Sequence, residues 1–230
     1  MRAKTTEASA GSAGRVAALD VGGHSISISL HGEGKRAVVL GPGAGGTRET
    51  PQLLSAAACL DPDRYTTILF NFPYQEARRR FPDPADICER TVAAVVDHAR
   101  TALGATKVVV GGRSFGGRMA SQAAANGLVC DGVAFLAYPL HPPGQETKLR
   151  DAHLSSIRVP MLFLQGTRDE FARLDLLQAT VERLGAIAEL ALFEDADHSF
   201  KTRRGAAMNS KQTEAAVFAR LAQWLESVAA

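Results

Sequence analysis

The fold of this chain is decided by KVVVGGRSFGGRMASQAA, residues 107–124. An apolar, β-branched run there leads into Gly-Arg-Ser-Phe-Gly (112–116), and an alanine-rich stretch of helical character follows. This is the pattern G-x-S-x-G between a strand and a helix, in which the serine stands on a sharp and strained turn. Side chains two positions before and after Ser114 would collide with neighbouring backbone, and glycine occupies both places. The segment predicts a nucleophilic serine; the structural alternative is a glycine-rich turn that lets a helix pack closely on a sheet.

Near-continuous apolar runs alternate with stretches of helical periodicity along most of the chain. Runs of this kind suit central parallel strands that are covered on both faces. We expect an α/β fold, with a mostly parallel central sheet, helices on both faces and an N-terminal antiparallel hairpin over 16–30. The expected parallel strands span residues 36–41, 66–72, 107–112, 132–138, 160–166 and 188–193, and the expected helices 51–61, 85–103, 115–126, 171–184 and 212–228.

Length and composition limit the domain organisation and the partners. The 230 residues predict a disordered N-terminal tail over 1–15 and a single domain over 16–230. The formal net charge is +2 with both signs interspersed, which favours neither a nucleic acid nor an acidic membrane as partner. The tail lacks the apolar run of a signal peptide, and no later run has the length of a membrane span, so a cytoplasmic protein is expected. The sequence leaves open whether the chain forms a homodimer.

The spacing of the cysteines and histidines supports neither a disulfide nor a metal site. The three cysteines, Cys59, Cys88 and Cys130, are widely spaced and predict reduced, small apolar side chains. The histidines are scattered without an H-x-x-x-H or C-x-x-C spacing, so no metal site is expected. We therefore expect chemistry that needs no cofactor.

A base for the serine is expected at the edge of the sheet where Ser114 emerges. Right-handed crossovers bring the carboxyl ends of parallel strands to one edge. In folds with this serine turn, the chain order is serine, acid, histidine. Of the six histidines, only His198 follows every plausible acid, and it lies in the loop after the last expected strand. His198 is therefore the predicted general base, the alternative being an ordinary surface histidine.

The acid that holds the histidine is expected after the strand at 160–166. Asp169 lies in Gly-Thr-Arg-Asp-Glu (166–170), on the loop leaving that strand. Its neighbour Glu170 could replace it, whereas two further aspartates are so close to His198 in sequence that they would need a tight local turn. The structural alternative is that Asp169 only caps the next helix. We expect Asp169 to orient His198.

The loop after the strand at 36–41 is expected to complete an oxyanion hole. One donor is the Phe115 N–H, and the other is expected from Gly-Pro-Gly-Ala-Gly-Gly (41–46), where Ala44 is the predicted donor. The same loop formally matches the dinucleotide-binding pattern G-x-G-x-x-G. That interpretation is weak, because the next strand leads into Asn71 instead of an acidic residue and Pro42 lacks an N–H.

With these residues identified, the chain resembles the α/β-hydrolase superfamily, near its dienelactone-hydrolase-like members. More narrowly, GGRSFGGRMA (111–120), AYPLHPPG (137–144) and LFLQGTRDEF (162–171) resemble the hydrolase-like family that contains a subunit of the non-specific-lethal chromatin complex and its testis-expressed relative. The resemblance implies the α/β-hydrolase fold, with Ser114 as nucleophile, Asp169 as acid and His198 as base. Relatives usually carry His-Gly in the oxyanion loop, where this chain has Pro-Gly (42–43).

The expected substrate is small, because only residues 139–159 separate two strands where true lipases insert a helical lid. The predicted function is a serine hydrolase of the carboxylesterase type, acting on a small-molecule ester or related acyl substrate, with thioesters and small amides left open. The alternative is a catalytically silent binding or scaffold protein. An ordered Ser, Asp and His favours the enzyme. The predicted substrate-binding residues are Phe72, Tyr74, Tyr138, Leu140 and His141.

Overall fold

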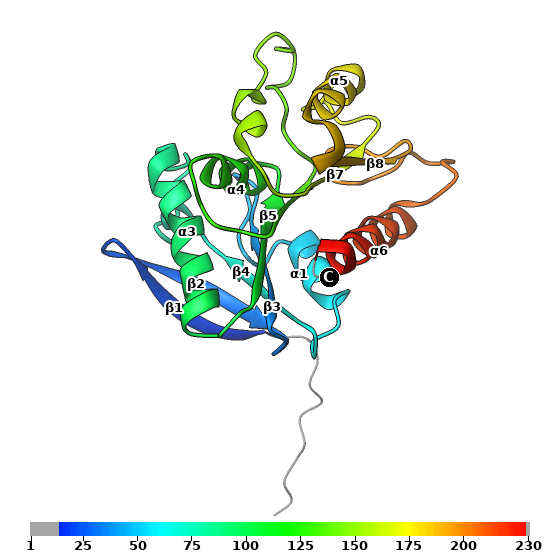
Figure 1. Ribbon diagram of the computed structural model, residues 1–230. Helices are drawn as coiled ribbons and strands as arrows, with labels where there is room; N and C mark the ends of the chain where they lie inside the picture. Colours follow the sequence, from blue (N-terminus) through cyan, green and yellow to red (C-terminus); the bar gives the residue numbers. More distant parts are fainter. Residues whose placement is uncertain (1–13, 229–230) are drawn as a thin grey trace, which may run out of the picture.

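The computed structural model of the protein describes residues 14–228. Eight strands in this part of the chain form one sheet in the order β1-β2-β4-β3-β5-β6-β7-β8 (Figure 1). From β4 to β8 every neighbouring pair is parallel, whereas β1, β2 and β4 pair antiparallel. The expected mostly parallel sheet with an N-terminal hairpin is confirmed. The strands are β1 (Arg15–Val21), β2 (His24–His31), β3 (Arg36–Gly41), β4 (Tyr65–Phe70), β5 (Lys107–Arg113), β6 (Gly132–Leu136), β7 (Met161–Gly166) and β8 (Ala188–Phe193).

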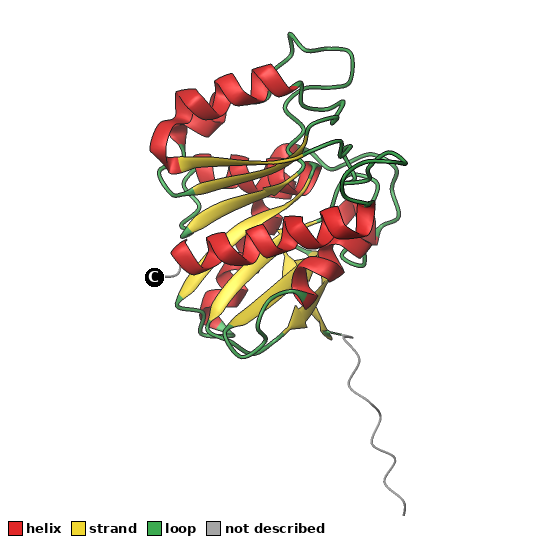
Figure 2. Cartoon of the chain, turned by 90° about the vertical axis from the view of Figure 1, so that its right-hand side faces the viewer, coloured by secondary structure: helices red, strands yellow, loops and turns green. Residues whose placement is uncertain are grey.

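The helices cover both faces of this sheet. Helices α1 and α6 lie together on one face, where α6 runs across the strands in Figure 2, and α3, α4 and α5 pack on the other. The α-helices are α1 (Pro51–Ala58), α2 (Pro73–Glu76), α3 (Ala85–Thr101), α4 (Phe115–Ala125), α5 (Leu174–Leu184) and α6 (Ser210–Val228), and the 3-10 turns are η1 (Ala152–Ser156) and η2 (Gly185–Ile187).

The structure differs from the sequence expectations at the ends of several elements and in one additional helix. Helix α5 begins at Leu174 instead of residue 171, and α6 begins at Ser210 instead of residue 212. Most of the expected N-terminal tail, residues 1–13, lies outside the described residues, and β1 begins at Arg15 instead of residue 16. The four-residue helix α2 was not expected, because a single turn is too short to show helical periodicity in the sequence. Among residues 14–228, no helix combines the length and the apolar character that a membrane span requires.

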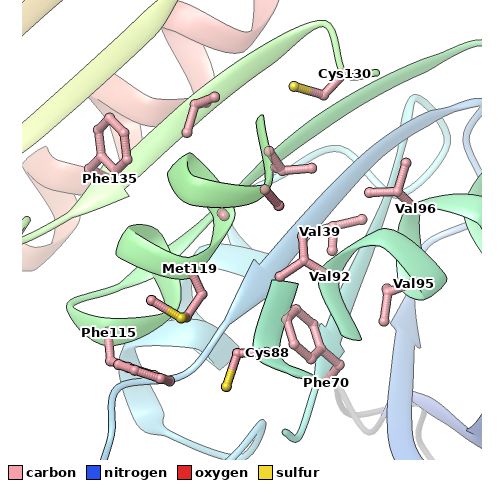
Figure 3. Close-up of a cluster of buried hydrophobic side chains, with 14 of the residues drawn as sticks. Val39, Phe70, Cys88, Val92, Val95, Val96, Phe115, Met119, Cys130 and Phe135 are labelled. Carbon is pink, nitrogen blue, oxygen red and sulfur yellow. The ribbon is translucent and has the colours of Figure 1, made fainter. Parts of the chain in front are cut away.

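The core is divided by the sheet into two apolar clusters, because successive side chains of a strand point to opposite faces. Val39 of β3 belongs to the cluster under α3 and α4, and its neighbour Val38 belongs to the cluster under α1 and α6. Figure 3 shows the first cluster, in which Val92 of α3 and Met119 of α4 are among the buried side chains. Cys88 also lies there, and burial raises the pKa of its thiol to about 12. This thiol is free and behaves as an apolar side chain, as expected.

Helix α4 approaches the sheet without intervening side chains. A Cβ atom at Gly116, in the first turn of α4, would lie 2.2 Å from the carbonyl oxygen of Gly41 at the end of β3. A Cβ atom at Gly112 of β5 would lie 2.2 Å from the same oxygen, and its φ of +148° also favours glycine. The two glycines that flank the turn therefore let α4, β3 and β5 meet backbone to backbone.

This contact generates a prediction about stability. Replacing Gly116 by alanine forces the Cβ atom against the Gly41 carbonyl, so α4 must shift away from β3. We expect the free energy of unfolding to fall by about 2–3 kcal/mol, as in other overpacked cores, measured by urea denaturation. The matched control is Gly45→Ala, because a Cβ atom there meets nothing within 4 Å. Equal stability of the Gly116→Ala protein and the wild type would contradict this account of the turn.

Candidate active site

The serine turn lies between β5 and α4. Ser114 has φ +49° and ψ −112°, a conformation that side-chain-bearing residues rarely adopt and that costs about 1–3 kcal/mol. The turn is held from both sides, because the Ser114 N–H donates to the Leu136 carbonyl at 2.9 Å and the Ser114 carbonyl accepts from the Arg118 N–H at 3.1 Å. The serine hydroxyl is thereby directed to the carboxyl edge of the sheet at the N-terminus of α4.

The structure brings the three predicted site residues Ser114, His198 and Asp169 together from three separate loops. His198, in the loop after β8, has its Nε2 atom 2.9 Å from Ser114 Oγ. Its Nδ1 atom lies 2.7 Å from Asp169 Oδ2, in the loop after β7. Because a carboxylate only accepts, Nδ1 carries the proton, and Nε2 is left to accept from the serine hydroxyl. The three side chains can therefore act as nucleophile, base and orienting acid.

The alternative acids take no part in this series of hydrogen bonds. Glu170 is exposed and forms no side-chain hydrogen bond or ion pair in the part of the chain that the structure describes. Asp195 forms ion pairs with Arg168 and Arg203. Asp197 accepts hydrogen bonds from two backbone N–H groups of its own loop. Among the acids weighed from the sequence, only Asp169 contacts His198 in the described residues.

Asp169 is fixed by partners that the sequence analysis missed. Its side chain is fully buried, Oδ2 accepts from Gln165 Nε2 at 2.5 Å, and Oδ1 accepts from the Phe171 N–H at 2.8 Å. Gln165 in turn accepts from the Tyr138 N–H at 2.8 Å. Asp169 does not cap α5, because this helix begins at Leu174 with Arg173 as its N-cap residue and no side-chain cap hydrogen bond. Its carboxylate instead holds the turn at Phe171 and contacts His198. One feature of the sequence could have identified Gln165: it is a polar residue near the end of the otherwise apolar strand β7.

The loop that carries His198 is held by an arginine of the serine turn. Arg113 donates to Ser199 Oγ at 2.9 Å and to the His198 carbonyl at 3.4 Å. Burial lowers the pKa of Arg113, while the charges of Asp169 and Asp197 raise it. The ring of Phe171 lies against the imidazole of His198, with 4.3 Å between their centroids. These contacts restrict the imidazole to the position beside Ser114.

A second serine–histidine contact in the structure cannot supply a nucleophile. Ser121 Oγ lies 2.8 Å from His153 Nε2, but the Ser121 side chain is completely buried within α4. Burial and the charge of Arg118 lower the pKa of His153, which favours its neutral form. This pair is a structural contact between α4 and η1.

The residues of the predicted oxyanion donors, Ala44 in the loop after β3 and Phe115 at the start of α4, line the same cavity as Ser114. Among residues 14–228, neither the Phe115 nor the Ala44 N–H donates to another protein group. The loop itself is anchored from α2. Tyr74 Oη donates to the Ala44 carbonyl at 2.8 Å, and Gln75 Nε2 donates to the carbonyls of Gly43 at 3.1 Å and Gly46 at 2.5 Å. In the described residues both N–H groups thus lack a protein acceptor, as donors to an oxyanion must.

The structure does not place the five predicted substrate-binding residues around the serine. Each has at most 1% of its surface exposed. Tyr74 and Tyr138 use their hydroxyl groups to hold backbone carbonyls, and His141 accepts from the Arg173 N–H at 2.8 Å. The expectation of direct substrate contact is corrected, because the side chains of all five residues are buried: Phe72, Tyr74, Tyr138, Leu140 and His141.

Two cavities lie at the site, one lined by Ser114 and the other by His198. The first has a volume of about 340 Å³ and the second of about 370 Å³, and Phe171 lines both. A larger cavity of about 790 Å³ lies beside β2 and α1 and contains none of the site residues. The first cavity is lined by residues that include Ala44, Ser114, Phe115, Arg118, Arg150 and Phe171, and the second by Arg168, Glu170, Phe171, Asp197, His198 and Ser199.

Comparisons with known proteins agree with this fold. A protein-family model described as "Alpha/beta hydrolase domain" matches residues 34–226. A dienelactone hydrolase from Anabaena variabilis is 18% identical, with a TM-score of 0.74 over 93% of this chain and 97% of that chain. A serine hydrolase without lid from Xanthomonas campestris is 19% identical, with a TM-score of 0.66 over 95% of this chain and 94% of that chain. A serine hydrolase homologue from Coxiella burnetii is 17% identical, with a TM-score of 0.68 over 92% and 95%. These structures share the fold.

The anchoring of the loop over residues 42–46 is open to a direct test. The variant Gln75→Met keeps the length of the side chain but removes its hydrogen bonds to Gly43 and Gly46. We expect a loss of about 1–3 kcal/mol of stability, because buried carbonyls lose their donors. Hydrogen exchange measured by mass spectrometry should become faster over residues 43–48. The control is Gln145→Met at an exposed position. Unchanged exchange in the loop of Gln75→Met would refute the anchoring role.

Proposed function

We propose that this chain, which belongs to the alpha/beta hydrolase domain family, is a serine hydrolase that cleaves a small ester or related acyl substrate. The observation that carries the proposal is the hydrogen-bonded series from Ser114 through His198 to Asp169. Each contact is at hydrogen-bond distance, and each residue comes from a different loop at one edge of the sheet. The segments 111–120, 137–144 and 162–171 also support the narrower resemblance, but the proposed activity rests on the site.

Acylation begins with the serine hydroxyl. Ser114 Oγ attacks the carbonyl carbon of the ester while its proton passes to His198 Nε2. The electron pair of the carbonyl moves to its oxygen, and the N–H groups of Phe115 and Ala44 stabilise the resulting oxyanion. As the carbonyl re-forms, the bond to the leaving oxygen breaks, and His198 returns its proton to that oxygen. The products of this half-reaction are an alcohol and an acyl-serine.

Deacylation repeats the same steps with water. His198 takes a proton from a water molecule, whose oxygen attacks the acyl carbon. The second oxyanion collapses, Ser114 Oγ leaves with the proton from His198, and the acid is released. In both halves Asp169 stabilises the imidazolium that forms, and its burial strengthens this interaction. One water is consumed for each ester bond that is broken.

The proposed substrate is small because the first cavity is small and has no helical cover. Its volume of about 340 Å³ is at the low end of the range for ligand sites. Between β6 and β7 the described chain contains only the 3-10 turn η1. The similar structure from Xanthomonas campestris is also described as having no lid. We therefore assign short acyl esters to this site, of the kind that carboxylesterases cleave.

The nucleophile is tested with a fluorophosphonate probe, which forms a covalent bond with an activated serine. We expect the wild type to be labelled and Ser114→Ala to remain unlabelled. Turnover of p-nitrophenyl acetate should fall by several orders of magnitude in Ser114→Ala, leaving the contribution of binding and the oxyanion hole. The control Ser155→Ala, at an exposed position, should behave as the wild type. An unlabelled wild type would favour a catalytically silent binding protein.

Chain length is tested with a series of p-nitrophenyl esters. The small cavity predicts that acetate and butyrate esters have a higher kcat/KM than the palmitate ester. Without a helical lid to open, a lipid–water interface has no apolar surface to uncover, so no interfacial activation is expected. The measurement is the initial rate across the series with and without micelles. A marked preference for palmitate would mean that the acyl group binds elsewhere.

A further inference from the structure

Two arginines line the cavity beside the serine. Arg118 follows Ser114 by one turn of α4, and Arg150 lies between β6 and β7. Both are partly exposed. Among residues 14–228, neither guanidinium forms an ion pair with a carboxylate, although many other arginines do. Arg118 lies over the ring of Phe115 at 5.6 Å, and Arg150 makes one long hydrogen bond of 3.4 Å.

The other titratable groups near these arginines do not neutralise them. Asp83 also lines the cavity, but its Oδ1 atom is paired with Arg79 at 2.6 Å, so that pair adds no net charge. Its Oδ2 atom is buried and accepts no hydrogen bond in the described residues. Burial and the charge of Arg118 lower the pKa of His153, which favours its neutral form. The cavity therefore has two positive charges with which no carboxylate in residues 14–228 forms an ion pair.

The two arginines also repel each other. Burial lowers the pKa of Arg150, and the charge of Arg118 lowers it further. Holding two guanidinium groups around one small cavity is unfavourable unless an anion enters it. A carboxylate suits the cavity best, because its two oxygens can accept from the fork of N–H donors that each guanidinium presents.

The position of the base decides which part of an ester occupies this cavity. His198 must return its proton to the leaving oxygen, so the alcohol part lies on the histidine side, in the cavity that includes Glu170 and Asp197. The acyl part then lies on the side of Phe115 and Ala44, which line the cavity of Arg118 and Arg150. The charge of the arginines is directed at the acyl part of the substrate.

We propose that the substrate is a monoester of a short dicarboxylic acid, whose free carboxylate is bound by Arg118 and Arg150 while Ser114 attacks the ester carbonyl. This inference rests on the proposed function and names the substrate class for it. One water is consumed, the bond between the acyl carbon and the leaving oxygen breaks, and the products are the dicarboxylic acid and an alcohol. Arg118 and Arg150 are specificity-determining residues of this site.

The test compares two esters of similar length, mono-p-nitrophenyl glutarate and p-nitrophenyl butyrate. The wild type should prefer the glutarate ester by about tenfold or more in kcat/KM, the value of a hydrogen-bonded charge pair. This preference should fall by about tenfold in Arg118→Gln and in Arg150→Gln, and salt should weaken it in the wild type. A folding defect lowers the rates with both esters together. The ratio of kcat/KM for the glutarate ester to that for the butyrate ester therefore reports only recognition of the carboxylate.

The matched control is Arg90→Gln, an exposed arginine of α3 that pairs only with Asp86 in its own helix. Its preference for the glutarate ester should equal that of the wild type. Arg150→Lys keeps the charge and should retain part of the preference. Equal kcat/KM for the two esters in the wild type, or the same ratio in the wild type and both glutamine variants, would overturn the proposal.

Failure of the proposed function is separated by a binding measurement that needs no turnover. Glutarate binding to the Ser114→Ala protein is measured by calorimetry, with and without the added Arg118→Gln and Arg150→Gln changes. If Ser114 is not labelled and neither ester is cleaved, the hydrolase proposal fails, and the carboxylate site is judged by glutarate alone. Binding that is lost with the arginines supports the site, whereas no binding, or binding that persists without them, overturns it.

Discussion

The structure depends on the backbone contact of helix α4 with strand β3. At Gly116 and Gly41 no side chain separates the two elements, and this close approach holds the turn that carries Ser114 in a strained conformation. A serine on a relaxed loop would be free to sample many positions, whereas this one has its backbone bonded to Leu136 and Arg118. The entropic cost of positioning the hydroxyl is thus met during folding, before any substrate binds.

A buried polar series then extends from this turn across the sheet. The Tyr138 N–H donates to Gln165, Gln165 donates to Asp169, and Asp169 accepts from His198. One network thus connects the ends of the neighbouring parallel strands β6, β7 and β8. A carboxylate as completely buried as Asp169 is stable only when its oxygens are fully hydrogen-bonded. The network therefore both hydrogen-bonds the buried carboxylate and sets the direction of the imidazole. Removing any member leaves another buried polar group without its partner.

The sequence predicted the elements and the order of the site residues better than it predicted the walls of the site. Apolar runs identify the strands, and right-handed crossovers bring the carboxyl ends of these strands to one edge of the sheet. His198 and Asp169 could be predicted as site residues because both follow such strand ends. The direction of a side chain within an irregular loop has no such periodicity. Phe72 and Tyr138 were therefore assigned to the substrate although they lie in the core. Arg150, remote in sequence from the serine, carried no signal that could link it to Ser114.

The central claim is that the strained turn places an activated serine in contact with His198. It is tested most directly by mixing the protein with a p-nitrophenyl carbamate, whose carbamoyl-enzyme hydrolyses slowly, and mapping the modification by mass spectrometry. The account predicts one carbamoyl group per chain, on the peptide that contains Ser114, with release of one equivalent of p-nitrophenol and a much slower reaction in His198→Gln. Modification of another residue, or an equal rate in His198→Gln, would contradict it.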